Sequence, residues 1–340
     1  MRHNDEKCLF AERLRQARLM MHLSMEDLSV RMGRIVTKQS ISRYETGRMQ
    51  PSHSILTALS KVFGVSEGYF YGESVKIDSP RFRLCSYVEN NSEEYTRIES
   101  LICYWVERYM NMEKSVQLEH EFHNPIANFK VANAHDAEKA ALLLRSEWEI
   151  GMGPIPSVFR LLERKGIKIL ETELPESILG LSTWADERQP LMVITNNKHI
   201  VTTERLRFTA AHELGHLLMA ISPETDSERI CNQFAGCFLM PRETLVEEFG
   251  EKRQFLTHEE VVDLHLQYGV SVAALIHQAW DMRIIPREHY EWWFNEVINK
   301  NKKEEGWGTY PLKEETGREK RIQSIYKQIK KLPPKWEHRS

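Results

Sequence analysis

The spacing of apolar residues divides the chain into a helical N-terminal part and a longer mixed part. Between residues 9 and 72, apolar positions recur with the 3.6-residue period of amphipathic helices. Hydroxyl side chains at Ser24 and Thr37 are predicted to cap two of these helices, because such groups accept hydrogen bonds from first-turn amides. The pattern predicts a compact all-helical unit whose helices cover residues 9–21, 25–32, 38–44 and 52–63.

The rest of the chain predicts a long helix and then a mixed domain. Residues 94–119 carry apolar positions on one stripe and predict a helix that either connects domains or packs between protomers; we favour the connection. Its flanks, 76–91 and 120–134, look irregular. Beyond residue 286 we expect a helix to about residue 300 and then a loosely ordered, charged end. Residues 135–285 predict an α+β domain, with helices over 136–148, 157–165, 203–221, 227–238, 257–267 and 271–282 and strands over 167–171, 181–185 and 191–195.

Charge and cysteine content narrow the class of protein. The net charge is −3, but residues 1–72 hold eleven Lys/Arg against seven Asp/Glu, which gives +4 there and leaves −7 elsewhere. A basic end on an acidic body favours nucleic acid as the partner of that end. No apolar run is long enough to span a membrane, and the first residues lack an apolar signal core, so a cytoplasmic protein without membrane partners is expected. The five scattered cysteines are expected to be reduced thiols: Cys8, Cys85, Cys103, Cys231 and Cys237.

The predicted helix 38–44 has the features of a DNA-reading helix. Ile41 should face the core of the helical unit. Glutamine suits adenine and arginine suits guanine or phosphate in the major groove. The outward-facing candidates for DNA contact are Lys38, Gln39, Ser40, Ser42 and Arg43.

The segment TKQSISRYETGRMQPS resembles the XRE family of lambda-repressor-like helix-turn-helix regulators. The resemblance implies an all-α domain that binds double-stranded operator DNA. We expect it to bind as a homodimer on a near-palindromic site. The turn between Gly33 and Thr37 is longer than the family pattern. An alternative is a protein-interaction module that has lost DNA binding.

The sequence HELGH at residues 212–216 is the strongest chemical signal. His212 and His216 are four residues apart and share one helix face, so both imidazoles can bind one Zn²⁺ while Glu213 takes a proton from water. Apolar residues surround the motif, and buried polar groups there need a partner such as a metal. We expect Glu228 as the third ligand, with Glu224 as the weaker alternative. Asn232 would hydrogen-bond a ligand histidine.

The segments ERLRFTAAHELGH and ERICNQFAGCFLMP resemble the ImmA/IrrE family of gluzincin-like metallopeptidases, with Cys231 where the family usually has alanine. The resemblance implies a zincin-like α+β fold with zinc as cofactor, and substrates that are regulatory proteins. Fusion to an XRE domain is common among similar proteins. No residue is assigned to the oxyanion, since structural roles are favoured for the candidates His199, Arg145, His258 and His265.

These observations predict a multidomain regulator. Its parts are a helix-turn-helix domain at 1–75, a helical connector at 76–134, a zinc metallopeptidase domain at 135–285 and a charged tail at 286–340. The expected function is DNA binding coupled to zinc-dependent cleavage of a repressor, an antitoxin or the chain itself, in a stress, phage or toxin–antitoxin response. The alternative is a non-proteolytic, antitoxin-like repressor whose zinc domain is structural or sensory.

Overall fold

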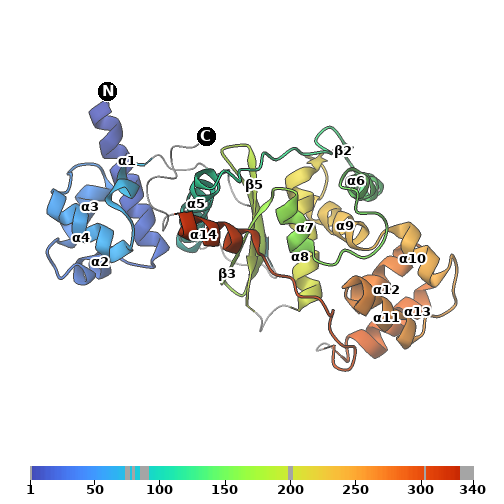
Figure 1. Cartoon of the computed structure of the whole chain (residues 1–340). Helices are drawn as coiled ribbons and strands as arrows, with labels where there is room; N and C mark the ends of the chain where they lie inside the picture. Colours follow the sequence, from blue (N-terminus) through green and yellow to red (C-terminus); the bar gives the residue numbers. More distant parts are fainter. Residues whose placement is uncertain are drawn as a thin grey trace. The chain divides into compact units, whose positions relative to one another are not determined.

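The computed structural model describes residues 2–72, 77–78, 81–84, 92–197, 202–301 and 304–329 (Figure 1). The chain folds into two compact units. The first contains Met1–Asp78 and Val88–Gln117, and the second contains Ser79–Tyr87 and Leu118–Ser340. The connection is therefore not simple, because the short stretch Ser79–Tyr87 belongs to the second unit while the residues on both sides of it belong to the first.

The first unit is all-helical. Its helices enclose a core that includes Phe10, Leu14, Leu28, Ile41 and Phe70. The predicted caps are present, since Ser24 forms a capping box with Asp27 and Thr37 accepts a hydrogen bond from the amide of Ser40. The elements are α1 (Arg2–Met20), α2 (Met25–Arg31), α3 (Lys38–Glu45), α4 (His53–Phe63), a 3-10 segment η1 (Glu67–Tyr71) and α5 (Ser92–Ser115).

A buried arginine ties α5 to α1. The guanidinium of Arg13 donates two hydrogen bonds of 2.7 Å to the carboxylate of Glu107 and another to the carbonyl oxygen of Gly72. Arg13 is fully buried, so it needs this compensation. The long helix predicted over 94–119 is thus present, and it packs on the helical unit.

The second unit is built on a four-stranded sheet. Its strand order is β1-β4-β5-β3, with β4 antiparallel to both neighbours and β3 parallel to β5. All of β5 and nearly all of β4 are buried. The strands are β1 (Arg81–Leu84), β3 (Lys168–Thr172), β4 (Ile178–Ala185) and β5 (Gln189–Thr195).

Helix α8 (Thr203–Leu218) lies on this sheet against β4 and β5, and α9 (Ser227–Leu239) packs beside it, as Figure 1 shows. Gly180 on β4 permits the close approach, because a β-carbon there would come within 2.8 Å of the Cγ2 of Thr209 on α8. Around them are α6 (Ala134–Glu147), α7 (Val158–Arg164), α10 (Arg242–Phe249), α11 (His258–Tyr268), α12 (Val272–Asp281), α13 (Arg287–Trp292), a π-helical turn (Trp293–Ile298) and α14 (Arg318–Ile329).

The fold class matches the prediction, an all-α unit plus an α+β unit, but several local predictions were wrong. The flanks predicted as irregular contain β1 and β2 (Lys130–Val131). The helix predicted to residue 221 ends at Leu218, because Ala220–Ile221 form a strand, β6, parallel to β2. No helix within the described ranges is long and apolar enough to cross a membrane.

The prediction of a loosely ordered end is wrong for residues 304–329. Trp307, Tyr310 and Glu314 are buried against the second unit, and α14 follows them. The charged composition of this segment predicted that it would be solvent-exposed. Instead, Glu314 pairs with the buried Arg207 of α8, a contact that the local sequence does not reveal.

Candidate functional site

Helix α8 brings three polar residues of the motif into the interior. Thr202 caps the helix, and His212 and Glu213 are fully buried in its last two turns. Gly215 faces α9, where a β-carbon would lie 3.1 Å from the Cε of Met219 and 3.2 Å from the Sγ of Cys231. The absence of a side chain at this position lets the two helices pack closely.

The close packing places Glu228 of α9 against both histidines. The Nε2 atoms of His212 and His216 are 3.1 Å apart. The Glu228 carboxylate lies 3.0 Å from Nε2 of His216 and 3.2 Å from Nε2 of His212. The hydrogen bonds of these imidazoles hold the pKa of Glu228 well below its usual range. The structure therefore brings together the three residues predicted as metal ligands.

The spacing of these atoms fits a tetrahedral ion. Ligand atoms each about 2.0–2.1 Å from a zinc ion lie about 3.3 Å from one another. The two imidazole nitrogens are 3.1 Å apart, and the Glu228 carboxylate presents Oε1 3.0 Å from His216 and Oε2 3.2 Å from His212, all close to that value. Two imidazoles and a carboxylate are also the donor set of several catalytic zinc sites. Glu224, the alternative ligand, lies in the exposed turn before α9 and is not part of the cluster.

Two hydrogen-bond partners orient residues of the HELGH motif. Nδ1–H of His212 donates to the Oδ1 of Asn232 over 2.9 Å, which leaves the lone pair of Nε2 directed at the cluster. Ser182 of β4 donates its hydroxyl to Oε2 of Glu213 over 2.6 Å. Asn232 was predicted in this role, whereas Ser182 was missed because a serine in a buried strand carries no motif.

A cavity of about 360 Å³ opens beside the cluster. It lies where β6 leads into α9, so solvent and a ligand reach the site from this side. The Glu228 side chain is 58% exposed there, while that of His216 is 4% exposed. The lining residues are His216, Ile221, Ser222, Pro223, Thr225, Ser227 and Glu228.

The other polar candidates have structural roles. Arg145 donates to the carbonyl oxygens of Gly151, Gly153 and Phe238. His265 bonds the carbonyl oxygen of Val270, and His258 stacks on Trp293. His199 lies outside the described residues. None of the three described candidates is therefore directed at the cluster.

The α3 helix presents a polar face in the first unit. Lys38, Gln39 and Arg43 are exposed, and Ser40 and Ser42 are half-buried. Ile41 and Tyr44 are buried on the opposite side, as the pattern predicted for Ile41. Ser40 is partly committed to the helix start, because its hydroxyl lies 3.0 Å from that of Thr37. The cationic and amide groups of Lys38, Gln39 and Arg43 therefore lie on the solvent-exposed face of α3.

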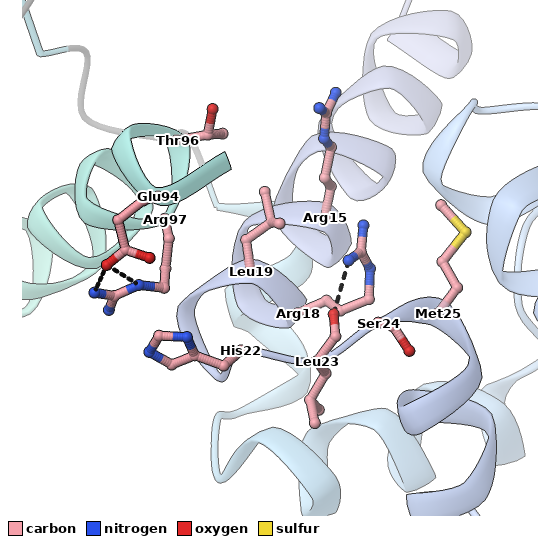
Figure 2. Close-up of a pocket in the computed structure, with 10 residues that line it drawn as sticks. All are labelled: Arg15, Arg18, Leu19, His22, Leu23, Ser24, Met25, Glu94, Thr96 and Arg97. Atoms are coloured by element: carbon pink, nitrogen blue, oxygen red, sulfur yellow. Dashed lines mark hydrogen bonds and ion pairs between the residues drawn. The ribbon is translucent and has the colours of Figure 1, made fainter. Parts of the chain in front are cut away.

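A second cavity, of about 570 Å³, lies in the first unit between α1, the start of α2 and α5 (Figure 2). Two of its three arginines, Arg18 and Arg97, are paired with acidic side chains. Arg18 pairs with Glu45 and donates to the carbonyl oxygen of Leu23, and Arg97 pairs with Glu94. These contacts stabilise the helical unit and use two of the three guanidinium groups that line the cavity.

Comparison with known families assigns two parts of the chain. Residues 14–70 match the helix-turn-helix family model, and residues 162–279 match the model of the IrrE N-terminal-like domain, a peptidase family. The chain joins a helix-turn-helix domain to an IrrE-like domain. A search of curated proteins found no match along the chain.

The helix-turn-helix match covers α3 and makes the chain a DNA-binding regulator. The IrrE-like domain is peptidase-like, and its matched residues include the sheet from β3 onward, α8 and α9. The match ends before α13, although the chain continues to pack on the same unit as far as α14.

Proposed function

We propose that this DNA-binding regulator carries a zinc-dependent endopeptidase that cleaves a regulatory protein, either a repressor, an antitoxin or a copy of itself. The observation that supports it most is the convergence of His212, His216 and Glu228, whose ligand atoms all lie within 4.8 Å of one another. Glu213 is the next residue after the first of these ligands, and it lies on the same helix.

The residues of the cluster would hold Zn²⁺ through two imidazole nitrogens and one carboxylate oxygen. Bound there, the ion would act as a Lewis acid. It would lower the pKa of a water molecule to about 7, as in other zinc enzymes. Asn232 keeps His212 in the tautomer that such binding needs.

Glu213 is the proposed general base. Its carboxylate would accept a proton from the water that attacks a peptide carbonyl carbon, and would pass that proton to the leaving nitrogen as the C–N bond breaks. Ser182 holds one carboxylate oxygen through its hydroxyl, so the side chain is oriented before substrate arrives. Burial of Glu213 keeps other solvent away from this proton transfer.

The helix-turn-helix domain would place the peptidase at an operator, as a homodimer on a near-palindromic site. Lys38, Gln39 and Arg43 are the proposed contacts, supported by Ser40 and Ser42. Arg43→Ala should weaken operator binding by about 1–3 kcal/mol if the guanidinium reads a base. Lys61→Ala on α4 removes the same charge away from α3 and is the matched control. Equal losses of DNA affinity in the two variants would contradict the assignment of α3 as the DNA-reading helix.

The peptidase is tested by separating metal binding from cleavage. The purified chain is loaded with zinc and incubated with proteins encoded beside it and with itself, and products are followed by mass spectrometry. Glu213→Gln should keep one zinc per chain and lose cleavage, whereas His216→Ala should lose both. Glu224→Gln, in the exposed turn, should keep both. Cleavage by Glu213→Gln at the parent rate would remove Glu213 as the base. Zinc binding without any cleavage would favour the structural or sensory alternative.

A further inference from the structure

Strand β1 covers the edge of the sheet that is nearest to the candidate site. It pairs antiparallel with β4, and β4 would be the outer strand without it. Their register places Arg81 opposite Ser182, Phe82 opposite Leu181 and Arg83 opposite Gly180. The backbone of residue 81 thus lies against the residue whose hydroxyl holds the Glu213 carboxylate.

A substrate peptide bound as an added strand would occupy the same edge of β4. Extended peptides bind to sheets by adding a strand to an open edge, where backbone hydrogen bonds supply the affinity. The edge beside Ser182 is the part of the sheet that is linked directly to Glu213. β1 already satisfies this edge, so an incoming peptide and β1 exclude one another.

The chain connectivity makes β1 a removable strand. The stretch Ser79–Tyr87 is joined on both sides to residues of the first unit, Met1–Asp78 and Val88–Gln117. The strand is only four residues long, and its register with β4 shifts between Arg83 and Leu84. A short edge strand with an irregular end contributes few backbone hydrogen bonds, so its release disturbs little of the second unit.

We propose that β1 is an internal strand that blocks the peptide-docking edge of β4, and that substrate enters as an extended strand once β1 is released. The proposal rests on the proposed function and adds how its substrate binds and how the site is kept latent. Since both flanks of β1 belong to the unit that carries the helix-turn-helix, a change in that unit is the natural trigger for release.

Two neighbouring proline substitutions test the block. In an antiparallel pair, alternate residues direct their N–H groups to the partner strand, so one of Phe82→Pro and Arg83→Pro removes a hydrogen bond to β4 and the other removes an outward N–H. Both variants are made in the full chain carrying Glu213→Gln. The probe is a fluorescein-labelled peptide with the sequence of residues 79–87 and serine in place of the cysteine, and its binding is followed by anisotropy.

We expect one proline variant to bind the peptide at least tenfold more tightly than the parent, and the other to behave like the parent. Hydrogen exchange of the β4 amides should rise in the same variant and fall again when peptide is added. Faster exchange without tighter binding would overturn the proposal, and so would unchanged exchange in both variants. Because anisotropy and hydrogen exchange measure peptide binding and strand opening rather than cleavage, this result does not depend on the peptidase assay, and the two ideas fail separately.

Discussion

Arg207 and Glu314 form an ion pair with both side chains fully buried, 2.5 Å apart, although they are 107 residues apart in the chain. Glu314 also accepts hydrogen bonds from the amides of Val158 and Phe159 at the start of α7. Arg207 donates to the carbonyl oxygen of Gly269 as well. The C-terminal segment therefore holds the N-terminal half of α8, the helix that carries His212 and Glu213 in its C-terminal half.

Glu314→Ala should lower the free energy of unfolding by about 3–5 kcal/mol, because it leaves the Arg207 charge buried without its partner. Urea denaturation followed by tryptophan fluorescence measures the change. Glu315→Ala is the control, since that carboxylate is 56% exposed and lies 3.6 Å from Arg160, and it should change stability by less than about 0.5 kcal/mol. Similar losses in the two variants would show that the buried pair has no special role.

Asn232→Ala should weaken zinc binding about 10–100-fold, because His212 loses the partner of its Nδ1–H. Competition with a chromogenic chelator measures the affinity. Gln233→Ala is the matched control on the next residue of α9, whose amide lies 3.6 Å from the Sγ of Cys237 instead. If both variants bind zinc like the parent, the hydrogen bond to Asn232 has no effect on the metal.

Gly215→Ala should destabilise the IrrE-like domain by about 1–3 kcal/mol, because the new methyl group enters a space already filled by Met219 and Cys231. Gly236→Ala on α9 is the control. Its nearest neighbour is the end of the Gln278 side chain, at 3.4 Å, and alanine favours a helix over glycine there. Thermal unfolding should separate the two variants, and equal midpoints would contradict the tight packing of α8 on α9.

The second unit should become less stable in weak acid, because His289 is held there as a neutral ring. Its Nε2 accepts hydrogen bonds from the amide of Leu256 and from Nε1–H of Trp293, and both require the neutral ring. Burial lowers the pKa of His289 below its ordinary value of 6.5. The unfolded chain then binds the proton more readily, so this stability is complete above pH 6.5 and is lost as the pH falls toward the lowered pKa.

Thermal midpoints at about pH 7.5 and pH 5.5 test this. The drop between them should be smaller in His289→Gln than in the parent, because the amide does not titrate in this range. His123→Gln replaces an exposed histidine and should keep the parent's full drop. If the thermal midpoint of His289→Gln falls as far as that of the parent, protonation of this ring does not cause the loss of stability in acid.

Local patterns account for what the sequence predicted well. The spacing of His212 and His216 fixes one helix face, and the turn after α8 is short enough to return Glu228 to it. Caps such as Ser24 and Thr37 act within one turn, so the helices of the first unit could be read directly.

The missed features depend on residues far apart in the chain. Ser182 reaches Glu213 across 31 residues, and Glu314 reaches Arg207 across 107. β1 is a four-residue strand paired with the edge of β4, and its alternating Arg-Phe-Arg-Leu pattern is too short to be assigned without that partner. Pairings of this kind follow from the topology, and no window of sequence contains them.

Glu314 lies late in the chain, so it is synthesised after most of the domain that it stabilises. A ribosome releases the helix-turn-helix domain first, and domains fold as they emerge. The carboxylate that neutralises Arg207 leaves the ribosome much later. A nascent chain is therefore expected to bind DNA while its IrrE-like domain is still less stable than in the full chain. Chains halted at residue 303 should bind operator DNA as well as the full chain, yet unfold their IrrE-like domain at lower urea concentration.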